Sequence, residues 1–84
     1  MTMKEETILQ ELEALAEKMS IKIIYEKFYG SGGLCTVNNE KRIIINKDLP
    51  LEKKNEILLH ELSQFNLDEI YMTPQLRQLL QSEV

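Results

Sequence analysis

The stretch Arg42-Ile43-Ile44-Ile45-Asn46 places three isoleucines in a row near the middle of an 84-residue chain. β-Branched residues favour β-strands, and successive side chains of a strand point to opposite faces of the sheet. Isoleucine therefore faces both sides of this strand, and we expect both sides to be covered. Helices would cover one side, whereas the C-terminal segment, a partner subunit or a bound peptide could cover the other.

Two more strands are expected before the isoleucine strand. Residues 21–28 are rich in β-branched and aromatic side chains, and residues 34–37 form a shorter apolar stretch. Gly30-Ser31-Gly32-Gly33 lacks the Lys-Ser/Thr pair of a phosphate-binding loop, so we interpret it as a turn. Asn38-Asn39 favours a tight hairpin, because asparagine tolerates left-handed conformations. The sequence therefore predicts a three-stranded antiparallel β-meander.

Helical patterns flank the strands. Residues 3–19 repeat apolar side chains at helical spacing, and Thr2 with Glu5 has the spacing of a capping box. The repeat covers fewer than three heptads, so we interpret this helix as core-facing and not as a coiled-coil partner. A second helix is expected at about residues 50–65, opened by a proline, and a short final helix after Thr73-Pro74.

Together the elements predict one small α+β domain over residues 1–84. The formal charge of −4 and the scattered basic residues argue against nucleic-acid binding. No apolar run is long enough to cross a bilayer, so no membrane partner is expected. A lone cysteine cannot form an internal disulfide, and no run of signal-peptide type opens the chain, so we expect a cytoplasmic protein.

The predicted second helix contains Leu58-Leu59-His60-Glu61-Leu62-Ser63-Gln64-Phe65. A zinc-peptidase helix carries H-E-x-x-H, in which two histidines one turn apart bind the metal and the glutamate activates a water. In this chain a glutamine replaces the second histidine. Because His60 and Gln64 are four residues apart, they share one side of the helix, away from its main apolar stripe.

The residues around this motif follow a characteristic order. Gly33-Leu34-Cys35-Thr36-Val37 precedes Lys41-Arg42-Ile43-Ile44-Ile45-Asn46, which is followed by Leu49-Pro50 and then by Leu58-Leu59-His60-Glu61-Leu62. Over residues 33–65 the chain resembles small bacterial zincin-like metallopeptidases, in which a strand ending in Asn leads through Leu-Pro into an H-E-L-G-H helix. The resemblance implies a zincin-like core with a supporting helix at residues 3–19.

The resemblance assigns roles only where residues match. It implies that His60 is the first zinc ligand and Glu61 the general base, with Gln64 at the position of the second ligand. A carboxamide oxygen is a weaker zinc ligand than an imidazole, so tight zinc binding is not expected. The candidates for a third ligand are downstream carboxylates, those of Asp68, Glu69 and Glu83.

Two functions remain open from the sequence. In the first, which we favour, the domain is a catalytically inactive, zincin-like interaction or regulatory module that binds an unknown protein or peptide, or a second copy of itself, without a cofactor. In the second, it is a weak zinc-dependent peptidase that uses His60, Glu61 and Gln64. A Cys35–His60 nucleophile pair is less favoured, because the strand pattern around Cys35 predicts a buried, inert thiol.

Overall fold

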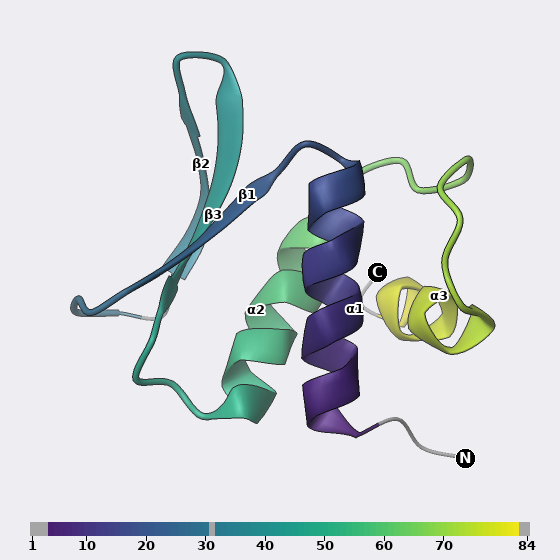
Figure 1. Cartoon of the computed structure of the whole chain (residues 1–84), viewed down its shortest axis with the longest axis horizontal. Coiled ribbons are helices and arrows are strands. Elements are labelled where there is room, and N and C mark those ends of the chain that lie inside the picture. Colours follow the sequence, from purple (N-terminus) through teal and green to yellow (C-terminus); the bar gives the residue numbers. More distant parts are fainter. Residues whose placement is uncertain (1–3, 31, 83–84) are drawn as a thin grey trace.

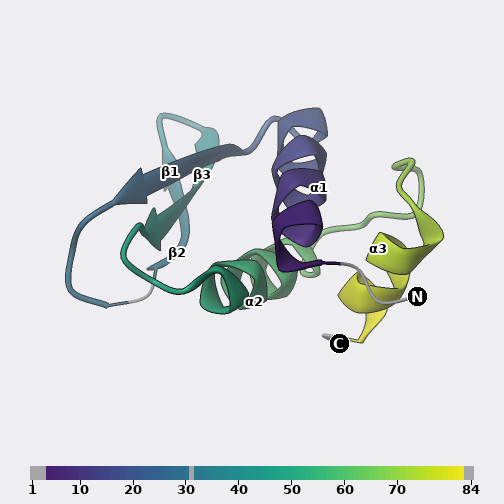
Figure 2. The same cartoon turned by 60° about the horizontal axis from the view of Figure 1, so that its bottom comes forward.

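The computed structural model describes residues 4–30 and 32–82. Its elements follow one another as α1 (Glu5–Lys18), β1 (Lys22–Glu26), β2 (Gly32–Val37), β3 (Glu40–Asn46), α2 (Leu51–Leu62) and α3 (Pro74–Gln81). The sheet lies on one side of α1 and α2, and α3 lies on their other side (Figure 1, Figure 2). The predicted α+β class and the order of its elements are confirmed.

The sheet is mixed and is not the antiparallel meander that the sequence predicts. Its strand order is β1-β3-β2, with β1 parallel and β2 antiparallel to β3. The isoleucine strand takes the central position, where β-branched side chains are best covered and the backbone pairs on both sides. The hairpin between β2 and β3 is confirmed, because Asn38 and Asn39 have φ angles of 52° and 68°.

The segment between β1 and β2 crosses the end of β3, and Asn46 holds it there. The Nδ2 group of Asn46 donates to the carbonyl oxygens of Phe28 at 2.9 Å and Gly30 at 3.0 Å. At Gly32 the φ angle is +136°, and a β-carbon at this position would overlap the carbonyl oxygen of Ile44. Glycine therefore lets the chain enter β2 directly against β3 after the crossing.

The helix starts agree with the sequence in one case and differ in another. Thr2 lies outside the described residues, and the N-cap position of α1 falls on Lys4, which makes no side-chain cap hydrogen bond. The predicted capping box of Thr2 with Glu5 therefore stays a prediction. At α3, Thr73 Oγ1 accepts a hydrogen bond from the Leu76 amide at 3.3 Å and Pro74 follows, as predicted.

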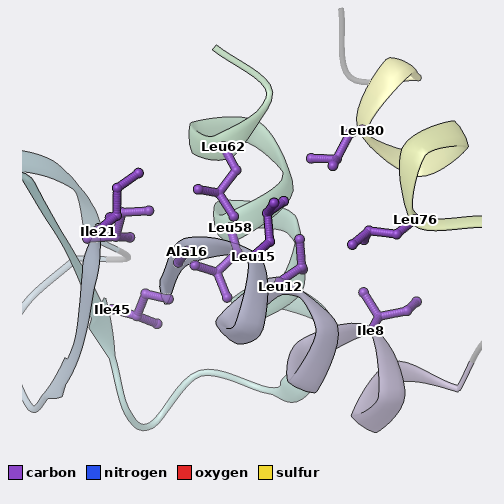
Figure 3. Close-up of a cluster of buried hydrophobic side chains, with 11 residues drawn as sticks. Ile8, Leu12, Leu15, Ala16, Ile21, Ile45, Leu58, Leu62, Leu76 and Leu80 are labelled. Carbon is purple, nitrogen blue, oxygen red and sulfur yellow. The ribbon is translucent and has the colours of Figure 1, made fainter. Parts of the chain in front are cut away.

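A single hydrophobic cluster joins the sheet to the helices (Figure 3). Its fully buried large side chains come from α1, β3 and α2, namely Leu12, Ile43, Ile45, Leu58 and Leu62. Leu76 and Leu80 of α3 close the cluster on the side away from the sheet. The buried Asn55 of α2 donates through Nδ2 to the Glu5 carbonyl oxygen at 2.8 Å and to its carboxylate at 2.6 Å, which ties α2 to the start of α1.

Within the described ranges, none of the helices has the length and apolar character needed to cross a membrane.

Candidate functional site

α2 ends at Leu62, earlier than the sequence predicts, so His60 lies in its last turn and Gln64 lies two residues past its end. Both side chains are exposed, whereas Leu58 and Leu62 of the same helix are fully buried. With about 100° between successive residues, His60 lies on the side of α2 opposite to those leucines. The two polar side chains point away from the core, as their spacing predicts. Glu61 is half-buried.

Gln64 takes part in closing the C-terminal end of α2. Its Nε2 group donates to the His60 carbonyl oxygen at 3.2 Å, and Ser63 Oγ donates to the same oxygen at 2.7 Å. Carbonyl groups in the last turn of a helix have no partner within the helix, so polar side chains stabilise them. This arrangement accounts for Ser63 and Gln64 without a metal ion.

The residues present around His60 do not fit a zinc site. Over residues 4–30 and 32–82, no three His, Cys, Asp or Glu side chains gather as a metal ion would require. Asp68 and Glu69 line a hollow with Asn66, and His60 does not line it. Glu83 lies outside the described residues. One imidazole beside a carboxamide supplies too few strong ligands, so no metal-dependent step follows from this arrangement.

Cys35 and His60 are not brought together. Cys35 is paired with Arg42 in the sheet, and its half-buried side chain lies on the face turned away from the helices. His60 lies on the solvent side of α2, so the sheet and the body of the helix separate the two side chains. The structure therefore offers no thiol–imidazole pair, and the thiol is less deeply buried than the sequence predicts.

Among residues 4–30 and 32–82, nothing forms a covering layer over one face of the sheet. The inner face carries Ile43 and Ile45, which are fully buried against the helices. By strand register, the outer face carries the alternate residues Lys22, Ile24, Glu26, Gly33, Cys35, Val37, Glu40, Arg42, Ile44 and Asn46. Among the described residues no helix covers this outer face, and α3 lies beyond α1 and α2 (Figure 1). The sequence left the C-terminal segment open as a cover for the second side of the isoleucine strand, and α3 does not provide that cover.

The free edge of β2 is a second uncovered surface. Gly32–Val37 contains no charged residue and no proline, and Leu34 and Val37 are 39% and 42% exposed. The other outer strand, β1, carries Lys22 and Glu26. Proteins commonly protect free edges with charges, prolines or bulges, because an unprotected edge accepts further strands. β2 has neither a charge nor a proline to protect it.

A titratable contact lies where α1 meets β1. The hydroxyl of Tyr25 donates to the carboxylate of Glu13 at 2.9 Å, and the Lys54 ammonium lies 5.6 Å from the centre of the Tyr25 ring. Burial, followed by the hydrogen bond to Glu13 and its negative charge, raises the pKa of Tyr25 far above the usual range. Tyr25 therefore stays neutral and links the sheet to α1.

Comparisons with protein-family models, with curated proteins and with solved structures found no match for this chain. The zincin-like resemblance of residues 33–65 therefore stays a prediction. The function has to be inferred from the residues of this chain and from the surfaces that they form.

Proposed function

We propose that this chain is a non-enzymatic interaction domain that binds an extended polypeptide along the free edge of β2. The observation that supports this function is an uncharged, proline-free outer strand that pairs on one side only among the described residues. The backbone amides and carbonyls of such an edge can pair with an added strand, as in other domains that bind peptides by β-augmentation.

The side chains of β2 supply contacts on both faces of an added strand. Leu34 and Thr36 lie in register with residues of the inner face, and Val37 lies on the outer face. Successive residues of an incoming strand would meet these side chains alternately, so an apolar or β-branched segment fits best.

The hairpin that contains β2 is fixed on its other side. The Lys41 ammonium lies 4.8 Å from the centre of the Phe65 ring, just beyond α2. A cation over an aromatic ring stabilises this contact between β3 and the end of the helix. The hairpin is therefore held from one side, while the edge of β2 is accessible from the other.

A weak zinc-dependent peptidase that uses His60, Glu61 and Gln64 is the alternative function. It rests on the sequence motif and on the resemblance of residues 33–65. The exposed position of His60 and the hydrogen bond from Gln64 to the His60 carbonyl support it less well than the β2 edge supports strand binding. Strand pairing needs no metal ion, so an inactive zincin-like framework is compatible with the favoured function.

Selection of random linear peptides on the immobilised protein tests strand binding. The matched proteins are wild type, Thr36→Lys on the β2 edge and Thr7→Lys on α1, since both threonines are exposed. A lysine on an edge strand discourages pairing, so we expect peptides to bind wild type and Thr7→Lys about tenfold more tightly than Thr36→Lys. Hydrogen exchange should slow in β2 and not in β1 when peptide binds. Equal binding to Thr36→Lys, or protection of β1 instead, would contradict the proposal.

A further inference from the structure

The outer face of the sheet is electrically neutral on an acidic chain. The chain has a formal charge of −4. Its charged residues on the outer face are two basic and two acidic, namely Lys22, Arg42, Glu26 and Glu40. Two copies of the chain that meet through this face would not suffer the net repulsion that their other surfaces impose.

The charges on this face are ordered along the strands. Lys22 at the start of β1 stands beside Arg42 of β3, and Arg42 forms an ion pair at 2.9 Å with Glu40, the first residue of β3. Ile24 and Ile44 are paired in the middle, and Glu26 stands at the other end of β1. Since Glu40 offsets the charge of Arg42, the face runs from a basic end at Lys22 through an apolar middle to an acidic end at Glu26.

The two ends of this face also differ in shape, because one end protrudes and the other is hollow. At the basic end Val37 is 42% exposed and lies at the tip of the hairpin. At the acidic end an open hollow of about 560 Å³ lies between the crossing segment and β2, with Phe28, Tyr29 and Gly33 among its lining residues. An exposed apolar side chain at one end thus corresponds to a hollow at the other, which Phe28 and Ile44 line together with Glu26.

We infer that two copies of this chain dimerise face to face through the outer face of the sheet, about a two-fold axis perpendicular to the strands. This axis reverses the strand direction, so Lys22 of each copy lies against Glu26 of the other, and Ile24 and Ile44 pack in the middle. Val37 of each copy points toward the hollow beside Phe28 and Tyr29 of the other. Aligned packing of two sheets is a common way to bury such faces.

This dimer leaves the backbone edge of β2 in each copy free, so it shares only the Val37 side chain with strand binding along that edge. It also covers Ile24 and Ile44, two of the apolar side chains that α1, α2 and α3 leave outside the main core. A domain of this size buries a smaller fraction of its surface than a larger one, so the added burial is a substantial gain.

Sedimentation equilibrium of the full chain, over a range of concentrations, tests the dimer. Lys22→Glu and Glu26→Lys each replace an attraction with a repulsion at two symmetry-related contacts, so each should weaken the dimer about tenfold. The double variant with both changes restores opposite charges across the axis and should recover wild-type affinity. Lys53→Glu with Glu56→Lys, which reverses an exposed ion pair of α2, is the matched control and should change nothing.

Three outcomes would overturn the inference: a wild-type chain that is monomeric at all concentrations, single variants that dimerise like wild type, or a double variant that stays as weak as the singles. Circular dichroism confirms that each variant is folded before it is compared. Thr36→Lys separates the two proposals, because it should impair peptide binding and leave the dimer intact. Loss of the dimer in Thr36→Lys, with no effect of the charge variants, would place the contact at the β2 edge and contradict a face-to-face dimer.

Discussion

The side-chain amide of Asn46 donates to the carbonyl oxygen of Phe28 at 2.9 Å, which joins the end of β3 to the segment that leaves β1. The same Nδ2 group donates to the Gly30 carbonyl oxygen at 3.0 Å, and the Oδ1 atom accepts from the Asp48 amide at 3.0 Å. One side chain thus fixes both the crossing between β1 and β2 and the turn that leads toward α2.

Replacement of Asn46 by alanine should destabilise the fold. It removes three hydrogen bonds and leaves the partly buried Phe28 carbonyl without its partner, so we expect a loss of about 2 kcal/mol in the free energy of unfolding. Urea denaturation followed by circular dichroism measures this loss. Asn66→Ala is the matched control, because Asn66 accepts from the Asp68 amide and holds no crossing segment. Its effect should stay below about 1 kcal/mol. Equal losses in the two variants would show that Asn46 stabilises only the turn after β3 and not the crossing segment.

Gly32 and Gly33 should respond differently to alanine. A β-carbon at Gly32 would overlap the Ile44 carbonyl oxygen at a φ of +136°, whereas a β-carbon at Gly33 meets nothing within 4 Å. We expect Gly32→Ala to cost at least about 2 kcal/mol in the free energy of unfolding, and Gly33→Ala to stay within about 0.5 kcal/mol. Urea denaturation of the two variants, side by side, measures the difference. A tolerated Gly32→Ala would mean that β2 does not begin against β3 as described.

Tyr25 should make the stability of the protein depend on pH in the alkaline range. Its pKa is raised in the folded state by burial and by Glu13, whereas in the unfolded chain it is about 10. The neutral hydroxyl therefore stabilises the fold below about pH 10, and this contribution is lost as the pH rises above the unfolded-state pKa toward the folded-state value.

Thermal unfolding between neutral and alkaline pH measures this dependence. Tyr25→Phe should be less stable than wild type at neutral pH, because it loses the hydrogen bond to Glu13, and should fall less steeply above about pH 10. Tyr71→Phe is the control, since Tyr71 is 83% exposed and should follow wild type. Parallel curves for wild type and Tyr25→Phe would show that Tyr25 is not shielded from solvent.

The exposed His60 and Gln64 should not support specific zinc binding. Titration of metal-stripped protein with zinc, followed by calorimetry, should show no saturable binding of one ion per chain in wild type or in Gln64→Ala. Removal of an exposed side chain should also change the free energy of unfolding by less than about 0.5 kcal/mol for His60→Ala. Saturable binding that Gln64→Ala weakens would revive the peptidase function and justify a screen of peptide substrates.

The elements of the fold could be predicted from the sequence, but the topology of the sheet could not. Runs of β-branched, aromatic and apolar residues locate the three strands that the structure describes, and helical spacing with proline and capping signals locates its three helices. The pairing partner of β1 depends instead on two distant features, the crossing fixed by Asn46 and the close approach at Gly32. The strand-ending Asn46 was visible in the sequence, but an asparagine there also fits an ordinary turn.

The candidate site shows a similar division. Helical spacing correctly places His60 away from the apolar stripe, but α2 ends at Leu62, so Gln64 is exposed in the turn after the helix. It does not show which downstream carboxylates come near them, since that depends on the path of the connection to α3. The guanidinium of Arg77 fixes this path by donating to the carbonyl oxygens of Leu67 at 3.2 Å and Ile70 at 2.6 Å. The uncovered outer face is indicated by Ile44, but what covers it could not be read from the sequence.

The two strand pairings of this mixed sheet close chain loops of very different length. The β2–β3 hairpin closes through Asn38-Asn39 alone, whereas β1 reaches β3 only after the chain has passed through β2. Loop closure costs more entropy as the loop lengthens, so the hairpin can form first and β1 can dock later. Within the sheet, β1 is then the strand that detaches most readily in the native state. Amides that pair β1 with β3 should exchange through partial opening, while amides that pair β2 with β3 should exchange more slowly.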